Sequence, residues 1–162
     1  MQYKYLFGMV GILASSFCYA TLGENPDSIN KDIQVLNTTN NGSQNLSSAK
    51  NITASKPQQK QQVNYEQYSF TTNDGISVIQ YVANDNVFAI KWHGSHIPNL
   101  RQLYGAYFPN YQTNKSSYIG TSQHKVTNTI LDAGVTGITG AFSGYALLKA
   151  EMPTNLTLAD LK

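Results

Sequence analysis

The chain has 162 residues, of which 41% are hydrophobic and only 12% are charged, and its formal net charge is +2. Eleven Lys and Arg residues stand against nine Asp and Glu residues, and no basic stripe is visible. These features exclude a protein that binds nucleic acid through clustered positive charge, because that charge supplies most of such binding.

Residues 1–20 have the three parts of a cleavable secretory signal peptide. Lys4 provides a positive start, an uncharged and mostly apolar run follows it, and Ala20 provides a small residue before the cut. We therefore predict cleavage between Ala20 and Thr21, and export to the periplasm or beyond the cell. The apolar run is shorter than the roughly 20 residues of a spanning helix, so we expect no membrane span after cleavage. An uncleaved anchor is the alternative.

Cys18 is the only cysteine. Lipoprotein signals place a small residue directly before the acylated cysteine, and Phe17 stands there instead, so we do not expect lipidation. Cleavage after Ala20 would leave a chain without a thiol, and therefore without a disulfide or a cysteine metal site. The stability of such a domain must come from its apolar core.

Aromatic residues divide the rest of the chain into two parts. Residues 21–64 contain none and are rich in Asn, Gln, Ser and Thr, whereas residues 65–162 contain thirteen. A polar segment without aromatic residues buries little apolar surface to offset the entropy of ordering it. We predict a flexible spacer over 21–64, with a segment that folds on binding as the alternative, and a single small domain over 65–162.

Three strands are predicted at the start of this domain. Residues alternate in polarity over Tyr65–Thr72, and apolar, often β-branched residues fill Ile76–Ala83 and Val87–Trp92. The turn signals Asn73-Asp74-Gly75 and Asn84-Asp85-Asn86 separate them. Short turns between successive strands predict an antiparallel meander.

A helix is predicted to begin at Pro98 and to end at Pro109. Its apolar residues recur every three or four positions: Leu100, Leu103, Tyr104, Tyr107 and Phe108. A helix of about ten residues is marginal alone, so it must pack on the sheet. Alternation places Phe88, Ile90 and Trp92 on one strand face, which puts Trp92 beneath the helix as the largest core side chain.

The remainder of the domain is predicted less sharply. Gln112–Asn128 is polar and is expected to form a loop, whereas Thr129–Leu131, Val135–Thr139 and Ala141–Ala150 are expected to be strands whose glycines mark bulges or close approach. Thr157–Lys162 is expected to form a capped helical turn. The predicted fold class is α+β, a small antiparallel sheet packed on one main helix.

The central block of this domain resembles a known family. Val87–Gly94 and Pro98–Phe108, together with Tyr81-Val82 and Ala141–Ala146, are similar to the small exported proteobacterial proteins grouped as domain of unknown function 2844. The Asn- and Gln-rich segment has no counterpart in that pattern. The family has no established activity, so the resemblance implies export and a shared fold and transfers no catalytic residue.

Three histidines form the candidate metal site. His93 and His96 stand in a His-x-x-His motif, and His124 would be a third ligand for zinc or copper. That spacing brings two imidazoles to one face only on a helix, and the motif lies in a predicted turn before Pro98. Two ordinary loop histidines are therefore the favoured interpretation.

No catalytic constellation is apparent in the sequence. Ser143 lacks the Gly-x-Ser-x-Gly spacing of hydrolases. The candidate binding residues are Arg101, whose guanidinium suits a carboxylate or phosphate, and Tyr111 and Tyr118, which are expected to be exposed. We expect a non-catalytic, cofactor-free binding module for a protein or cell-envelope partner. The alternative is a metal-binding protein or metal-dependent hydrolase that uses the three histidines.

Overall fold

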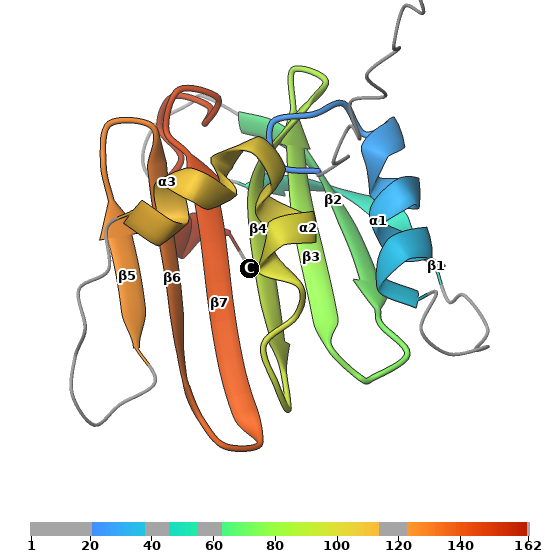
Figure 1. The fold of residues 1–162 in the computed structure, drawn as a ribbon. Coiled ribbons are helices and arrows are strands. Elements are labelled where there is room, and N and C mark those ends of the chain that lie inside the picture. The colour runs from blue at the N-terminus through green and yellow to red at the C-terminus, as the bar shows by residue number, and fades with distance from the viewer. Residues whose placement is uncertain (1–20, 38–45, 55–62, 114–122, 162) are drawn as a thin grey trace, which may run out of the picture.

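The computed structural model describes residues 21–37, 46–54, 63–113 and 123–161. Seven antiparallel strands form one sheet in the order β1-β2-β3-β4-β7-β6-β5, with three helices on one of its faces (Figure 1). The strands are β1 (Leu46–Ala54), β2 (Val63–Thr71), β3 (Ser77–Ala83), β4 (Asn86–Gly94), β5 (His124–Thr127), β6 (Leu131–Ile138) and β7 (Ala141–Leu148). The helices are α1 (Asp27–Asn37), α2 (Leu100–Tyr104) and α3 (Phe108–Thr113), with 3-10 turns η1 (Gly105–Tyr107) and η2 (Leu158–Asp160). The α+β class is confirmed.

The predicted meander is present as β2, β3 and β4, each within two residues of its predicted ends. The turn between β3 and β4 has Asn84 at φ 51° and Asp85 at φ 59°, which is the left-handed backbone of a tight hairpin. Gly75, at φ 83°, serves the turn before β3. The turn residues therefore determine where β2, β3 and β4 reverse direction in this half of the sheet.

The second half of the sheet differs from its prediction. Residues 129 and 130 form a bend rather than part of a strand, and β6 begins at Leu131. The predicted loop contains the short edge strand β5, in which only Val126 is buried in the core. Four residues with one buried side chain give too little alternation to predict a strand.

The predicted single helix is broken in the middle. Gly105 ends α2 with φ 47°, a 3-10 turn follows, and α3 begins at Phe108. Pro109 therefore does not end a helix, as predicted, but lies in the first turn of α3, where a missing N–H group costs nothing.

The predicted flexible spacer is wrong for residues 21–37. Leu22, Ile29 and Ile33 are all at most 5% exposed, because α1 and the residues just before it pack into the core on the helix-covered face. Backbone N–H groups of Gly23 and Val87 donate to Val87 and Glu24 carbonyls, both at 2.9 Å, and so join this segment to β4. An aliphatic stripe at helical spacing builds a core without aromatic residues, and residues 46–54 of the same stretch add the edge strand β1.

Trp92 lies beneath the helices, as predicted. It is 2% exposed, and its indole Nε1 donates to the Tyr104 hydroxyl of α2 at 3.4 Å. A Cβ atom at Gly144 of the adjacent strand would overlap the indole ring, so the glycine leaves the space that the ring occupies. Close approach at this glycine is the role predicted for glycines of these strands.

Phe88 is not on the face of Trp92, contrary to the prediction. Pairing shifts between Tyr81 and Val82, so that Tyr81 opposes Ala89 and Val82 opposes Val87. Phe88 is the extra residue of this β-bulge and points to the opposite face of the sheet. A bulge reverses the alternation, which a count of every second residue cannot anticipate.

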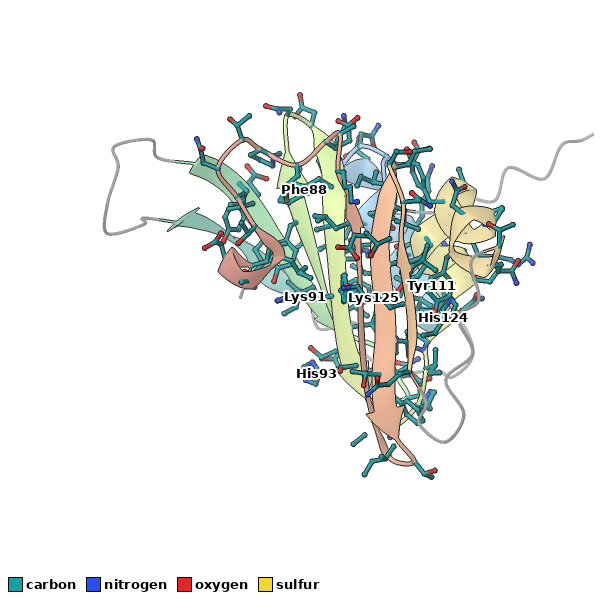
Figure 2. The ribbon with its side chains drawn as sticks, turned by 90° about the vertical axis from the view of Figure 1, so that its left-hand side faces the viewer. Phe88, Lys91, His93, Tyr111, His124 and Lys125 are labelled. Atoms are coloured by element: carbon teal, nitrogen blue, oxygen red, sulfur yellow. The ribbon has the colours of Figure 1, made fainter. Side chains whose placement is uncertain are left out.

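The face opposite the helices is half covered by the C-terminal segment. Leu156 and Leu161 of this segment are buried against a second cluster that includes Tyr81, Phe88 and Leu147. The view along the sheet shows η2 on this side and α1–α3 on the other (Figure 2). The predicted cap of the final turn is confirmed as a reciprocal pair of hydrogen bonds between residues 157 and 160. Within the described residues, no helix has the length and apolar character needed to cross a membrane.

Candidate binding site on the sheet

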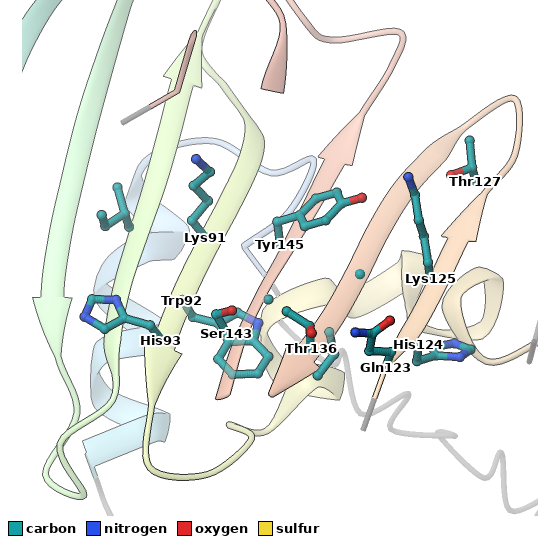
Figure 3. Close-up of a pocket in the computed structure, with 14 residues that line it drawn as sticks. Lys91, Trp92, His93, Gln123, His124, Lys125, Thr127, Thr136, Ser143 and Tyr145 are labelled. Atoms are coloured by element: carbon teal, nitrogen blue, oxygen red, sulfur yellow. The ribbon is translucent and has the colours of Figure 1, made fainter. Parts of the chain in front are cut away.

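On the face of the sheet opposite the helices, the half that the C-terminal segment leaves uncovered forms a groove, here called the sheet groove (Figure 3). Its volume is about 890 Å³, and strands β3 to β7 contribute to it. Trp92 and His124 of the helix side border it. The other polar and aromatic residues that line it are Lys91, His93, Gln123, Lys125, Thr127, Thr136, Ser143 and Tyr145. Antiparallel hydrogen bonding between these strands fixes the backbone of the lining residues, and therefore the positions from which their side chains extend.

Strand register places the lining residues in rows across the sheet. Lys91 pairs with Tyr145, Tyr145 with Gly134, and Gly134 with Lys125. Residues directly opposite one another in adjacent strands point to the same face, so these four positions form one row. Three strand spacings separate its two lysines, or roughly 14 Å between their Cα atoms. A second row runs from His93 through Ser143.

The Tyr145 ring forms the floor in the middle of the first row. An ideal Cβ atom at Gly134 would lie 2.8 Å from its Cε1, so the ring occupies the space that a side chain there would fill. Its hydroxyl donates to Oδ1 of Asp132 at 3.0 Å, and the Thr127 hydroxyl donates to the same oxygen at 3.1 Å. Burial, with the hydrogen bond and charge of Asp132, raises the pKa of Tyr145 to about 12. The phenol is therefore neutral at physiological pH and fixed in place.

The charge of the sheet groove is positive. Lys91 and Lys125 stand at either end of the first row, with the Tyr145 ring between them (Figure 3). The Lys91 ammonium donates to the carbonyl oxygen of Leu161 at 2.5 Å, and partial burial lowers its pKa. The residues that line the groove include no Asp or Glu, and the neighbouring Asp132 accepts hydrogen bonds from two of them.

The three candidate metal ligands are not brought together. His93 is exposed on the groove side, whereas the ring of His124 lies on the other side against Tyr111, with ring centroids 4.6 Å apart (Figure 2). His96 is in a loop, with Nε2 2.6 Å from Oδ2 of Asp74. The part of the chain that the structure describes holds no group of three or more His, Cys, Asp or Glu residues suited to a metal ion. Sequence spacing could not reveal that β4 and β5 turn their histidines to opposite faces.

The candidate binding residues outside the groove lie on the helix side. Arg101 is exposed, with its guanidinium carbon 5.0 Å from the centre of the Phe108 ring. Tyr111 is 8% exposed and packs edge-on against Tyr104 at 5.3 Å, so its predicted exposure is wrong. The reason is α3, which forms where a loop was expected and turns Tyr111 toward the core. Tyr118 lies outside the described residues.

Of the two residues at the predicted cleavage site, the structure describes only Thr21. Ala20 lies outside the described residues, and Thr21 is fully buried.

A buried carboxyl on the helix side was missed by sequence reasoning. Asp32 of α1 is 0% exposed and accepts hydrogen bonds from the side-chain amides of Gln80 at 3.0 Å and Gln102 at 2.7 Å. Burial raises the pKa of Asp32 to about 7, although the two amide hydrogen bonds lower it. The signal that could have revealed it is a single acidic residue next to Ile33, within the apolar stripe of a helix.

The sheet groove itself was also missed. Its sequence signal is a set of polar residues at alternate positions in otherwise apolar strands, such as Lys91 and His93 in β4. That signal identifies a groove only once the strand order β4-β7-β6-β5 is known, because this order brings the polar residues of these strands together on one face.

Comparison with protein families yields a match over most of the chain. The model of a protein family described as protein of unknown function (DUF2844) matches residues 18–161. The match includes the central block on which the resemblance was based, and it also includes residues 21–37. No curated protein and no solved structure matches the chain.

Proposed function

Because this chain belongs to DUF2844, a family of proteins of unknown function, we propose its role from geometry: a non-catalytic binding module whose binding site is the sheet groove. The observation that carries the proposal is the groove itself, a hollow of about 890 Å³ with a positive and aromatic lining on fixed strands. Ligand sites are typically preformed concavities with a few convergent polar groups.

Two features of the lining favour binding over catalysis. The Tyr145 phenol is held neutral by Asp132, and the Lys91 ammonium donates to a backbone carbonyl. General acid–base catalysis needs a group whose pKa lies near the working pH and which can reach the substrate proton. Tyr145, with a pKa near 12, does not meet that requirement.

The partner belongs outside the cytoplasm under this proposal. The basis is the signal-peptide pattern of residues 1–20, which predicts export. A protein or another component of the cell envelope is therefore the expected occupant of the groove.

A substitution that fills the groove tests the proposal. Ser143 is exposed in the second row, so Ser143→Trp places a large ring in the groove without burying a new group. Asn30→Trp, at an exposed position of α1 on the opposite face, is the matched control. The full chain as processed by its host is applied to an array of cell-envelope glycans and peptides. We expect Ser143→Trp alone to lose binding, with unchanged melting temperatures for both variants. Binding retained by Ser143→Trp would place the site elsewhere.

A further inference from the structure

The middle of the sheet groove places a fixed aromatic ring beside a row of hydroxyl groups. Tyr145 lies in the first row, and in the second row Ser143 of the same strand stands opposite Thr136 of β6. Two residues along a strand separate the rows, which is roughly 7 Å. We infer that the groove binds a neutral sugar chain, with one sugar ring on Tyr145 and its hydroxyl groups on the second row. This inference rests on the proposed function and names its ligand class.

The charged groups at the groove already have partners within the protein. The Lys91 ammonium donates to the carbonyl oxygen of Leu161, and Lys125 has an interaction partner as well. Asp132 is two residues from Gly134 in β6, so its carboxylate lies on the same face, beside the Tyr145 ring to which it is hydrogen-bonded. An acidic unit on that ring would lie next to the Asp132 carboxylate, and like charges repel. A neutral ligand leaves all of these interactions undisturbed.

The Tyr145 ring determines the shape of the unit that it binds. The ring covers Gly134, its hydroxyl donates to Asp132, and it is only half-buried, so it presents a fixed surface to the groove. The negative face of an aromatic ring attracts groups with positive edges. A sugar whose ring hydroxyl groups are all equatorial, as in glucose, has such C–H groups on both of its faces. The fixed position of the tyrosine lowers the entropy that is lost on binding.

The polar side chains around the ring suit the hydroxyl groups of a sugar. Ser143, Thr136 and Gln123 are exposed and line the groove, and each of them both donates and accepts hydrogen bonds, as a sugar hydroxyl does. A carboxylate accepts up to about four hydrogen bonds, and Asp132 accepts from two neighbouring hydroxyls, so it can also accept from the ligand. Stacking and hydrogen bonding are therefore available on the same side of one sugar unit.

The location of the groove favours a sugar chain over a peptide. Peptides that bind sheets usually add a strand to an edge, through main-chain hydrogen bonds. The groove lies on the face of β4, β7 and β6, whose backbone groups already pair with neighbouring strands. Only side chains are offered to the ligand there, so an extended peptide would leave its own backbone groups without strand partners.

Calorimetric titration of the full chain with cellohexaose and with chitohexaose tests this inference. Hexagalacturonate, which is acidic, and a Ser-Gly hexapeptide are the comparison ligands. We expect a neutral sugar chain to bind most tightly, with an affinity that added salt leaves unchanged, because the ligand has no charge to screen.

Three substitutions identify the contacts. Tyr145→Leu removes the ring and should weaken binding about tenfold, whereas Tyr145→Phe keeps the ring and should weaken it less. Thr136→Val should weaken binding about threefold, and because Thr136 is exposed this variant tests the hydroxyl row even if Tyr145→Leu unfolds. The matched control is Tyr68→Leu, since Tyr68 packs on the helix-side cluster and its hydroxyl likewise donates to a carboxylate, Oε2 of Glu66 at 2.7 Å. It should leave the affinity unchanged.

The outcomes separate this inference from the proposed function. Failure of both neutral chains to bind would overturn the inference, and so would equal effects of Tyr145→Leu and Tyr68→Leu or an unchanged affinity for Thr136→Val. Tighter binding of hexagalacturonate or the peptide that Ser143→Trp abolishes would also overturn it, while the groove would stand as a binding site. If Ser143→Trp leaves every interaction of the chain unchanged, the proposed function fails together with the inference.

Discussion

Two glycines of the sheet are covered by aromatic rings, one on each face. The indole of Trp92 occupies the space over Gly144 on the helix side, and the phenol of Tyr145 occupies the space over Gly134 in the groove. Glycine weakens a strand because it has no side chain to pack, and a ring from the neighbouring strand restores the buried contact. Gly144 thus makes room for a core side chain on one face, and Gly134 makes room for the floor of the groove on the other.

Gly144→Ala should destabilise the protein. The added methyl group would overlap the Trp92 indole, which cannot move away easily because Tyr104 of α2 lies against it. Overpacking of this kind typically costs about 1–3 kcal/mol. Urea denaturation measures the loss, and Ser143→Ala, an exposed neighbour in the same strand, serves as the control. Equal midpoints for the two variants would contradict the packing described here.

Trp92→Ala should leave the domain largely unfolded. Removing a buried tryptophan costs about 3–5 kcal/mol, against a total stability of roughly 5–15 kcal/mol. Trp92 is the only tryptophan, so its fluorescence reports directly on the site. We expect blue-shifted emission that iodide quenches poorly in the native protein, whereas water-like emission would place the side chain outside the core.

At the scale of elements, α1 is part of the domain rather than a linker. It lies on the helix side of the sheet next to α2 (Figure 1), and its buried residues belong to the same cluster as Trp92. Its Asp32 joins β3 through Gln80 and α2 through Gln102. Three elements that are distant in sequence are thereby held in one arrangement.

The contribution of α1 can be measured with two substitutions on the same helix. Ile33 is 5% exposed and Val35 is 47% exposed. Ile33→Ala should lower the free energy of unfolding by about 2–5 kcal/mol, because it leaves a cavity between α1 and the sheet. Val35→Ala should have almost no effect on the urea midpoint. Identical midpoints for both would mean that α1 is not packed on the domain.

At the scale of the whole molecule, sequence reasoning predicted what is local. The meander follows from alternation and from the turn at Asn84 and Asp85, and the position of Trp92 follows from one strand and the helix after it. The pairing of β4 with β7 could not be predicted, because about fifty residues separate them and no local signal specifies the partner. The groove depends on that pairing, so the row of Lys91, Tyr145 and Lys125 could not be predicted from the sequence.

Stability should depend on pH through Asp32. Its pKa is raised to about 7 in the folded protein, whereas an unfolded aspartate titrates near about 4. Between these values the folded state holds a proton that the unfolded state has lost, so stability falls as pH rises from about 4 to about 7. The fall attributable to this group is up to about 4 kcal/mol, and it levels off above the folded pKa.

Asp32→Asn isolates this effect. An amide is neutral throughout the range, and Oε1 of Gln80 has no hydrogen-bond partner among the described residues, so it can accept from the new amide. Thermal melts between pH 4 and pH 8 should show a flatter profile for Asp32→Asn than for the wild type. Asp85→Asn, in an exposed turn, should keep the wild-type slope. A wild-type profile that rises over this range would contradict a protonated Asp32.

The position of β4 at the centre of the sheet has a consequence for how the chain folds. The strand receives backbone hydrogen bonds from Gly23 near one end of the sequence, and its Lys91 contacts Leu161 near the other. Contacts between such distant residues slow folding, because the chain must close a long loop before they form. During synthesis, one edge of β4 stays unpaired until β7 has been made. An unpaired strand edge can pair with another chain and cause aggregation. The core therefore cannot be completed before β7 and Leu161 have been made.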